Sequence, residues 1–342
     1  MVAYTLAQAE DLLLHYALED IPTFLWGPPG IGKSDLYKQV TKRLSVETKK
    51  KWGFIDFRVS QHDPVDLSGM PVADLKSGTT RWLAPSLLPQ TARDGEYGIL
   101  LLDEANTAVQ LMESAMYSLI LDRFVGDYKL PKGWVPMAAG NRMLDKALGR
   151  KMGTAIRNRF AHVEVQPDLE AWLAWASRSG INPAMPAFLR FRPKLLHIMP
   201  TGDENSFPTP RAWERVAKLL NKPESVRYQL VSGLVGEGPA GEVEAFMRTW
   251  TKLPSIATIL SNPKGVAVPD MEEPALFYAL SSALAKRVDA KTFSNAIIYM
   301  KRCPKEFEVS MVTDATRRDK GLMETKAYTS WCLDNQDIAR AA

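Results

Sequence analysis

The chain has 342 residues, of which 46% are hydrophobic and 24% charged, a composition that excludes disorder over the whole length and supplies apolar side chains for two packed units. Its 43 basic and 39 acidic residues give a net charge of +4, which falls well short of the charge on a dedicated DNA-binding surface. Only two cysteines are present, Cys303 and Cys332, so a disulfide framework and a cysteine-based zinc site are excluded.

The sequence carries no sign of a membrane segment. No apolar run is long enough to cross a bilayer, and the first residues lack the basic and apolar pattern of a secretory signal. Two widely separated cysteines suit a reducing compartment. We therefore expect a soluble, cytoplasmic protein without membrane contacts.

The first half of the chain alternates short apolar runs with helical patterns, which indicates an α/β fold. Each apolar run has the length and composition of a buried parallel strand. The predicted strands are residues 23–26, 54–59, 98–102, 135–139 and 162–165. A parallel sheet of these five strands is large enough to hold one nucleotide at its edge.

The first predicted strand leads directly into the P-loop pattern G-x-x-x-x-G-K-[ST], and an amphipathic stretch at 35–44 follows. The residues of the pattern are Gly27, Pro28, Pro29, Gly30, Ile31, Gly32, Lys33 and Ser34. Glycines let backbone N–H groups approach a polyphosphate at a helix N-terminus. We expect Lys33 to reach the β and γ phosphates of ATP and Ser34 to ligate Mg²⁺. An ordinary glycine turn is the alternative, and the agreement of every fixed position with its surroundings argues against it.

The predicted strand 98–102 ends in two adjacent acids, Asp103 and Glu104. Ligands of open α/β sheets bind at the carboxyl edge, where these side chains are expected. Asp103 is predicted to hold the Mg²⁺ shell, and Glu104 is predicted to activate the water that attacks the γ phosphate. The alternative is that Asp103 only caps the helix that follows.

Four other polar residues are candidates for the same site. Asn141 follows the strand 135–139 and can orient a water or bind the γ phosphate, although Gly-Asn is also a common turn. Arg157 and Arg159 precede the last strand, and either can neutralise charge on a transferred phosphoryl group or form a simple surface salt bridge. Arg211 follows Pro210 at a predicted helix start, where it either contacts the γ phosphate or is solvated.

After Pro167 the pattern becomes helical, with Leu169, Trp172 and Leu173 on one face and further helices predicted at 276–288 and 293–300. We therefore expect three parts. Residues 1–166 form an α/β nucleotide-binding domain, residues 167–262 form a helical lid, and residues 263–342 form a helical C-terminal extension.

The ordered set of motifs in residues 1–220 resembles the AAA+ ATPases, and within them the MoxR-like group of the helix-2-insert clade. The P-loop resembles Walker A, residues 101–104 resemble Walker B, and Asp103-Glu104-Ala105-Asn106 is similar to the MoxR Asp-Glu-x-Asn signature. Asn141 matches sensor 1, the segment 155–160 matches the arginine-finger segment, and Arg211 matches sensor 2 of the lid. Thr107 departs from the pattern, since many MoxR sequences have arginine there.

The resemblance implies Mg²⁺-dependent ATP hydrolysis by a homo-oligomeric ring, with a hexamer as the expected state. In such rings the arginine finger, Arg159 or Arg157, serves the nucleotide of the neighbouring subunit. The resemblance also implies chaperone-like remodelling or assembly of a partner protein, often one that contains a von Willebrand factor A domain.

Two predicted hairpins fall where insertions of this clade belong, at residues 70–83 and 123–130. Their aromatic residues Trp82, Phe124 and Tyr128 either grip a substrate in the pore of a ring or pack against their own domain, and packing is favoured.

Two alternative functions are considered. The first is a nucleic-acid motor or loader, since related ATPases include helicases, but the small net charge argues against nucleic acid as a partner. The second is a nucleotide-gated scaffold with little turnover, which the intact acid pair disfavours.

Overall fold

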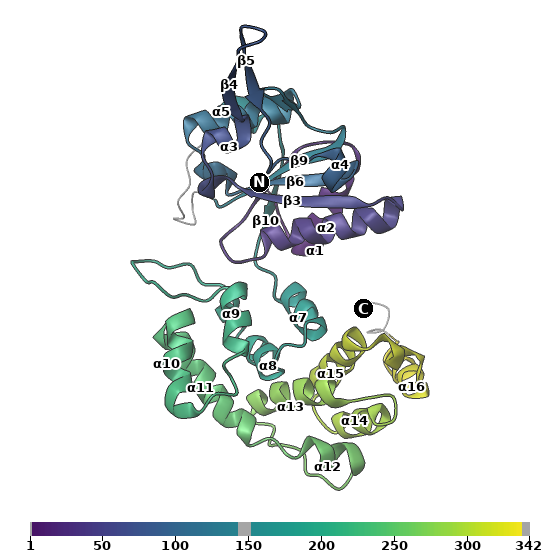
Figure 1. Cartoon of the computed structure of the whole chain (residues 1–342). Coiled ribbons are helices and arrows are strands. Elements are labelled where there is room, and N and C mark those ends of the chain that lie inside the picture. The colour runs from purple at the N-terminus through teal and green to yellow at the C-terminus, as the bar shows by residue number, and fades with distance from the viewer. Residues whose placement is uncertain (1, 143–151, 337–342) are drawn as a thin grey trace. The chain divides into compact units, whose positions relative to one another are not determined.

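A computed structural model describes residues 2–142 and 152–336 of the chain. The chain divides into two compact units, Met1–Pro167 and Asp168–Ala342, and each is described by itself (Figure 1). The predicted boundary between residues 262 and 263 falls within the second unit and stays a prediction. Over the described ranges, no helix is long and apolar enough to cross a membrane.

The first unit is built on a parallel sheet of six strands in the order β1-β10-β2-β9-β6-β3. The strands are β1 (Ala3–Tyr4), β2 (Thr23–Trp26), β3 (Trp52–Arg58), β6 (Tyr97–Asp103), β9 (Gly133–Gly140) and β10 (Ala161–Val165). The predicted α/β class is confirmed, and each of the five predicted strands is present. The sixth strand, β1, is a two-residue edge strand that is too short to produce an apolar run.

Helices cover both faces of this sheet (Figure 1). On one face, α1 (Leu6–Leu18) and α2 (Lys33–Thr48) share a core with sheet residues such as Ile99 and Leu101. On the other face, α3 (Pro64–Ser68) and α5 (Gln110–Leu121) share a core with residues such as Leu100 and Leu102. Because side chains alternate along a strand, one continuous apolar run supplies both cores.

Short helices connect these elements. They are the 3-10 helices η1 (Val59–Gln61) and η2 (Ala105–Thr107), together with α4 (Thr91–Asp94) and α6 (Thr154–Arg157). The helix η1 follows β3 and η2 follows β6, so both begin at the carboxyl edge of the sheet. They therefore lie where the predicted active site is expected.

Both predicted hairpins form. The hairpin of β4 (Met70–Asp74) and β5 (Thr79–Leu83) projects from the first unit, and β7 (Phe124–Val125) pairs with β8 (Tyr128–Lys129) (Figure 1). The backbone N–H of Trp82 donates to Asp127 Oδ2 at 2.8 Å, which ties the two hairpins together. The Tyr128 ring is buried, and its hydroxyl donates to the carbonyl of Pro89 at 2.7 Å. Trp82 and Phe124 keep 38% and 46% of their surface exposed.

The described part of the second unit consists of helices and the loops between them. The α-helices are α7 (Leu169–Arg178), α8 (Ala184–Phe191), α9 (Pro210–Ala217), α10 (Glu224–Val235), α11 (Glu237–Thr251), α12 (Ile256–Ser261), α13 (Pro274–Arg287), α14 (Phe293–Met300), α15 (Lys305–Arg318) and α16 (Lys326–Asp334). Two short 3-10 helices, Pro193–Leu196 and Lys320–Glu324, complete it. Helix α13 joins two cores, because Ala279 packs with α7 to α11 and Phe277 packs with α14 and α15.

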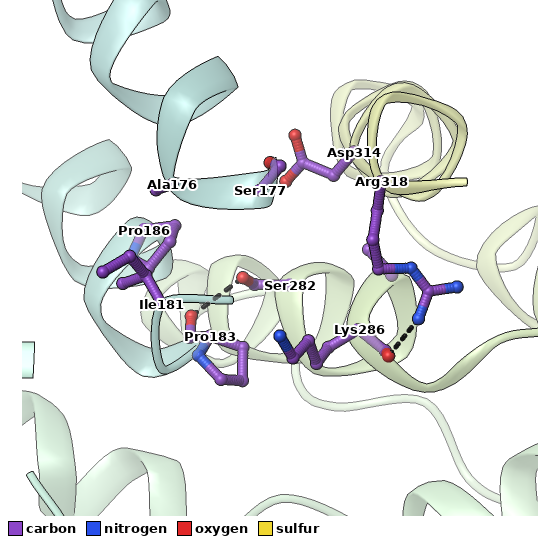
Figure 2. Close-up of a pocket in the computed structure, with 10 residues that line it drawn as sticks. Ala176, Ser177, Ile181, Pro183, Pro186, Ser282, Lys286, Asp314 and Arg318 are labelled. Carbon is purple, nitrogen blue, oxygen red and sulfur yellow. Dashed lines mark hydrogen bonds between the residues drawn. The ribbon is translucent and has the colours of Figure 1, made fainter. Parts of the chain in front are cut away.

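A bidentate ion pair ties α8 to α15 in this unit. Arg190 donates to the two oxygens of Asp314 at 2.5 and 2.7 Å, and both side chains are nearly buried. Beside the pair lies a small pocket between α7, α8, α13 and α15 (Figure 2). Its volume of about 30 Å³ leaves room for a few water molecules and not for a nucleotide. Arg318 at its rim donates to the carbonyls of Lys286 and Val288 and so caps the end of α13.

Candidate active site

The P-loop residues 27–34 connect the end of β2 to the first residues of α2, as the sequence predicts. Strand β2 lies inside the sheet between β10 and β9, so the loop opens at the carboxyl edge beside the end of β9. A Cβ atom at Gly27 would lie 2.7 Å from Ile31 Cδ1 and 2.8 Å from Val165 Cγ2, which leaves room for glycine alone. Gly32 has φ 95° and is the residue before α2, a backbone shape that glycine adopts without strain.

Lys33 lies at the centre of the loop. Its Nζ donates to the carbonyls of Gly27 and Pro28 at 2.8 and 3.0 Å, and to Asn141 Oδ1 at 2.8 Å. Asn141 is 108 residues away in the sequence and directly follows β9. Two residues that the sequence proposes for the same phosphate are therefore in direct contact.

Ser34 and Asp103 form the second contact of the site. Ser34 Oγ donates to Asp103 Oδ2 at 2.6 Å, and the Asp103 side chain is buried at the end of β6. A hydroxyl and a carboxylate are oxygen ligands of the kind that Mg²⁺ takes, and Mg²⁺ sites in proteins typically use one or two carboxylates plus waters and substrate phosphates. The pair therefore fits the predicted ion. No cluster of three or more His, Cys, Asp or Glu residues suited to a metal occurs among the described residues.

Glu104 is exposed, next to Asp103, in a left-handed backbone conformation with φ 56°. Its backbone N–H donates to Asp103 Oδ1 at 2.9 Å. Its carboxylate Oε2 accepts a short hydrogen bond from the hydroxyl of Ser60, which lies in η1 just beyond β3. Ser60 could not be predicted as a site residue, because a lone serine after a strand carries no motif.

Asn106 supports Asn141 from the adjacent segment. Asn106 is buried, and its Nδ2 donates to the backbone carbonyl of Asn141 at 2.9 Å. A Cβ atom at Gly140 would lie 2.3 Å from Asn106 Oδ1, so this close approach depends on glycine at the end of β9. The asparagine of the Asp-Glu-x-Asn segment thus fixes the backbone that carries Asn141.

Asp56 on β3 is a further acid that the sequence analysis does not identify. Its Oδ1 is buried without a hydrogen-bond partner among the described residues, and its Oδ2 lies 3.7 Å from Arg58 Nε. Burial raises the pKa of this carboxyl above its usual value, and the negative charge of Asp103 raises that pKa further.

Arg157 is the last residue of α6 and Arg159 follows two residues later, and neither makes a hydrogen bond or ion pair with the P-loop in the part of unit 1 that is described. Arg159 Nη2 donates to the hydroxyl of Tyr117 on α5 at 3.0 Å, and its guanidinium lies 5.4 Å from the centre of that ring. The Nε atoms of both arginines are buried and have no hydrogen-bond partner among the residues that the structure describes. The backbone of Arg157 is linked to β2, because its carbonyl contacts His162 Nε2 at 2.8 Å and His162 Nδ1 accepts from Trp26 Nε1 at 2.9 Å.

Arg211 belongs to the second unit and lies in the first turn of α9. The hydroxyl of Thr209 caps this helix by accepting from the N–H of Ala212 at 3.0 Å, and Pro210 occupies the first turn. The Arg211 side chain is exposed, with no hydrogen bond or ion pair to the residues that the structure describes. Its predicted contact with a γ phosphate stays a prediction.

A family model described as NTPase matches residues 23–121, which is less than a third of the chain. The matched segment includes the P-loop and the acid pair. No curated protein sequence matches this chain.

Solved structures give distant likenesses. A putative ATPase from Cytophaga hutchinsonii is 14% identical, with 92% of this chain and 81% of that chain covered and a TM-score of 0.39. A variant of RuvB from Thermotoga maritima is 16% identical, with 87% and 86% covered and a TM-score of 0.37. NtrX from Brucella abortus is 13% identical, with 92% and 69% covered and a TM-score of 0.37. Likenesses this distant do not bear on what the chain does.

Proposed function

We propose that the first unit binds a nucleoside triphosphate together with Mg²⁺ and hydrolyses the bond to its γ phosphate, with ATP as the nucleotide. The observation that carries this proposal is the convergence of Lys33 with Asn141 and of Ser34 with Asp103 at one edge of the sheet. These four residues come from the start of α2 and the ends of β6 and β9, and phosphoryl transfer needs each of their side-chain types. The match of residues 23–121 to an NTPase family model supports the same chemistry.

The roles of the residues follow from their positions. Backbone N–H groups of the P-loop and the start of α2 attract the phosphates, and Lys33 exchanges its contacts with loop carbonyls for contacts with phosphate oxygens. Ser34 and Asp103 would hold Mg²⁺, and the ion would supply positive charge to the bound polyphosphate. Asn141 orients the γ phosphate or the attacking water.

Glu104 acts as the general base. It takes a proton from water as the water oxygen attacks the γ phosphorus, and the bond from phosphorus to the bridging oxygen breaks, so that the diphosphate leaves with that oxygen. The hydrogen bond from Ser60 occupies one oxygen of this carboxylate. Release of that bond would leave the oxygen free to accept the proton.

We further propose that the chain is an AAA+ ATPase of the MoxR-like group that acts as a hexameric ring. The support is the ordered motif set, together with an arginine pair that makes no hydrogen bond or ion pair with the P-loop among the described residues and is therefore available to a neighbouring subunit. Tyr117 orients Arg159 for that role through the hydrogen bond and the ring contact. The work done by hydrolysis is proposed to be remodelling or assembly of a partner protein, with a von Willebrand factor A domain as the expected partner.

Phosphate release from MgATP tests the proposal. The wild-type protein is expected to release phosphate continuously, and Lys33→Ala is expected to bind no nucleotide. Addition of double-stranded DNA is expected to leave the rate unchanged, whereas strong, salt-sensitive stimulation would favour the nucleic-acid motor. Bound nucleotide without turnover would favour the scaffold.

A further inference from the structure

Asp56 faces the same side of the sheet as the Mg²⁺ ligands proposed above. Strands β3 and β6 pair in parallel, with Asp56 opposite Leu101 and Arg58 opposite Asp103. Residues that are paired in this way point to the same face, and so do residues two apart on one strand. Leu101 packs in the core beneath α1 and α2, so Asp56 and Asp103 both point toward α2, whose first turn carries Ser34.

The protein alone leaves the Asp56 carboxylate poorly satisfied. Oδ1 is buried and has no hydrogen-bond partner among the described residues. Oδ2 lies 3.7 Å from Arg58 Nε, and the Arg58 side chain is half exposed, so this pair contributes little. Buried polar atoms normally have partners, and the negative charge of Asp103 disfavours the charged form of Asp56 more than the positive charge of either Arg58 or Lys38 favours it. A hydrated cation beside Asp103 would give Asp56 Oδ1 a hydrogen-bond partner and would offset the repulsion between the two carboxylates.

We infer that Asp56 is a positioning residue of the Mg²⁺ site, where its carboxylate accepts hydrogen bonds from water molecules of the ion that Ser34 and Asp103 ligate. This inference rests on the proposed function. In this role Asp56 adds negative charge and fixed acceptors to a site that has only two protein ligands, and so raises the affinity for Mg²⁺. It makes no direct contact with the phosphates and takes no part in proton transfer.

The test measures Mg²⁺ affinity without hydrolysis. A fluorescent methylanthraniloyl ATP analogue is bound to the full-length protein, first in EDTA and then during a titration with MgCl₂. Asp56→Asn is expected to raise the Mg²⁺ concentration at half-saturation about tenfold, the lower end of the usual effect of such outer partners. Its affinity for the analogue in EDTA is expected to equal that of the wild type.

Asp35→Asn is the matched control. Asp35 is an exposed acid in the first turn of α2 that pairs with Lys38, so the substitution removes the same charge nearby without touching the buried oxygen. It is expected to leave the Mg²⁺ dependence unchanged.

Three results would overturn the inference: an unchanged Mg²⁺ midpoint in Asp56→Asn, an equal shift in Asp35→Asn, or a loss of binding by Asp56→Asn in EDTA, which would mark a structural role. Failure of the wild type to bind the analogue at all would contradict the proposed function instead.

Discussion

The hydroxyl of Ser60 donates a hydrogen bond to the carboxylate of Glu104, which joins the segment after β3 to the segment after β6. The bond holds the proposed general base by one of its two oxygens, and that oxygen must give up the bond before it takes a proton from water. Glu104 is exposed, and the bond from Ser60 is the one hydrogen bond that its side chain makes with the described residues. The Ser60 hydroxyl therefore holds the base in a resting orientation, which it must leave to take a proton.

Ser60→Ala is predicted to raise the basal rate of hydrolysis. A hydrogen bond to a charged group contributes about 1.5–3 kcal/mol, so its removal is expected to speed the step about tenfold or more. The measurement is steady-state phosphate release at saturating MgATP. Ser60→Thr keeps the hydroxyl and serves as the control. A slower Ser60→Ala protein would mean that the bond holds Glu104 in its productive position.

Gly140→Ala is predicted to disturb the site through Asn106. The added methyl group would lie 2.3 Å from Asn106 Oδ1, so this buried side chain must move and release the carbonyl of Asn141. We expect a loss of about 1–3 kcal/mol of stability from overpacking, together with slower hydrolysis. Thermal unfolding and phosphate release measure the two effects.

Gly241→Ala is the control for that substitution, because a Cβ atom at this position in α11 has nothing within 4 Å. It is expected to keep or slightly raise the melting temperature. If Gly140→Ala were as stable and as active as the wild type, Asn106 would not be needed to hold Asn141.

A mixture of two inactive proteins is predicted to regain activity. Lys33→Ala removes the phosphate contact of one subunit, and Arg159→Ala removes the arginine proposed to serve the next one. In mixed rings some sites combine an intact P-loop with an intact arginine, so phosphate release should peak at intermediate ratios. Lys33→Ala mixed with Glu104→Gln should stay inactive, since both changes affect the same side of the site. Absence of recovery at every ratio would contradict an arginine acting in trans.

Asp314→Ala is predicted to lower the thermal stability of the second unit strongly. The substitution leaves Arg190 nearly buried without its bidentate partner, and an uncompensated buried charge costs about 3–5 kcal/mol. Glu242→Ala is the control, because its pair with Arg192 is about half exposed and is expected to contribute less than about 1 kcal/mol. Calorimetry compares the two, and equal effects would mean that Arg190 finds another partner.

The sequence predicts the sheet and most of the candidate site for a physical reason. A buried parallel strand must be apolar on both faces, and the functional residues follow these runs directly, as Asp103 follows β6 and Asn141 follows β9. The carboxyl ends of parallel strands share one edge, so residues distant in sequence can be assigned to one site before the strand order is known.

Ser60 and Asp56 could not be predicted in the same way. The role of Ser60 depends on the pairing of β3 with β6, which brings η1 to Glu104 across 44 residues of sequence. Asp56 interrupts the apolar pattern of β3, and that interruption is the one local signal that it carries. Asp56 pairs with Leu101 in the register of β3 and β6, and this pairing is what places it on the face of the sheet that α2 covers.

The most direct test of the central claim follows the fate of ATP bound to Glu104→Gln. Loss of the base is expected to slow hydrolysis at least a hundredfold while the P-loop contacts remain. After mixing with MgATP and rapid removal of free nucleotide, the account predicts intact triphosphate on this variant and diphosphate on the wild type. Hydrolysis by the variant at the wild-type rate, or failure of both proteins to retain nucleotide, would contradict it.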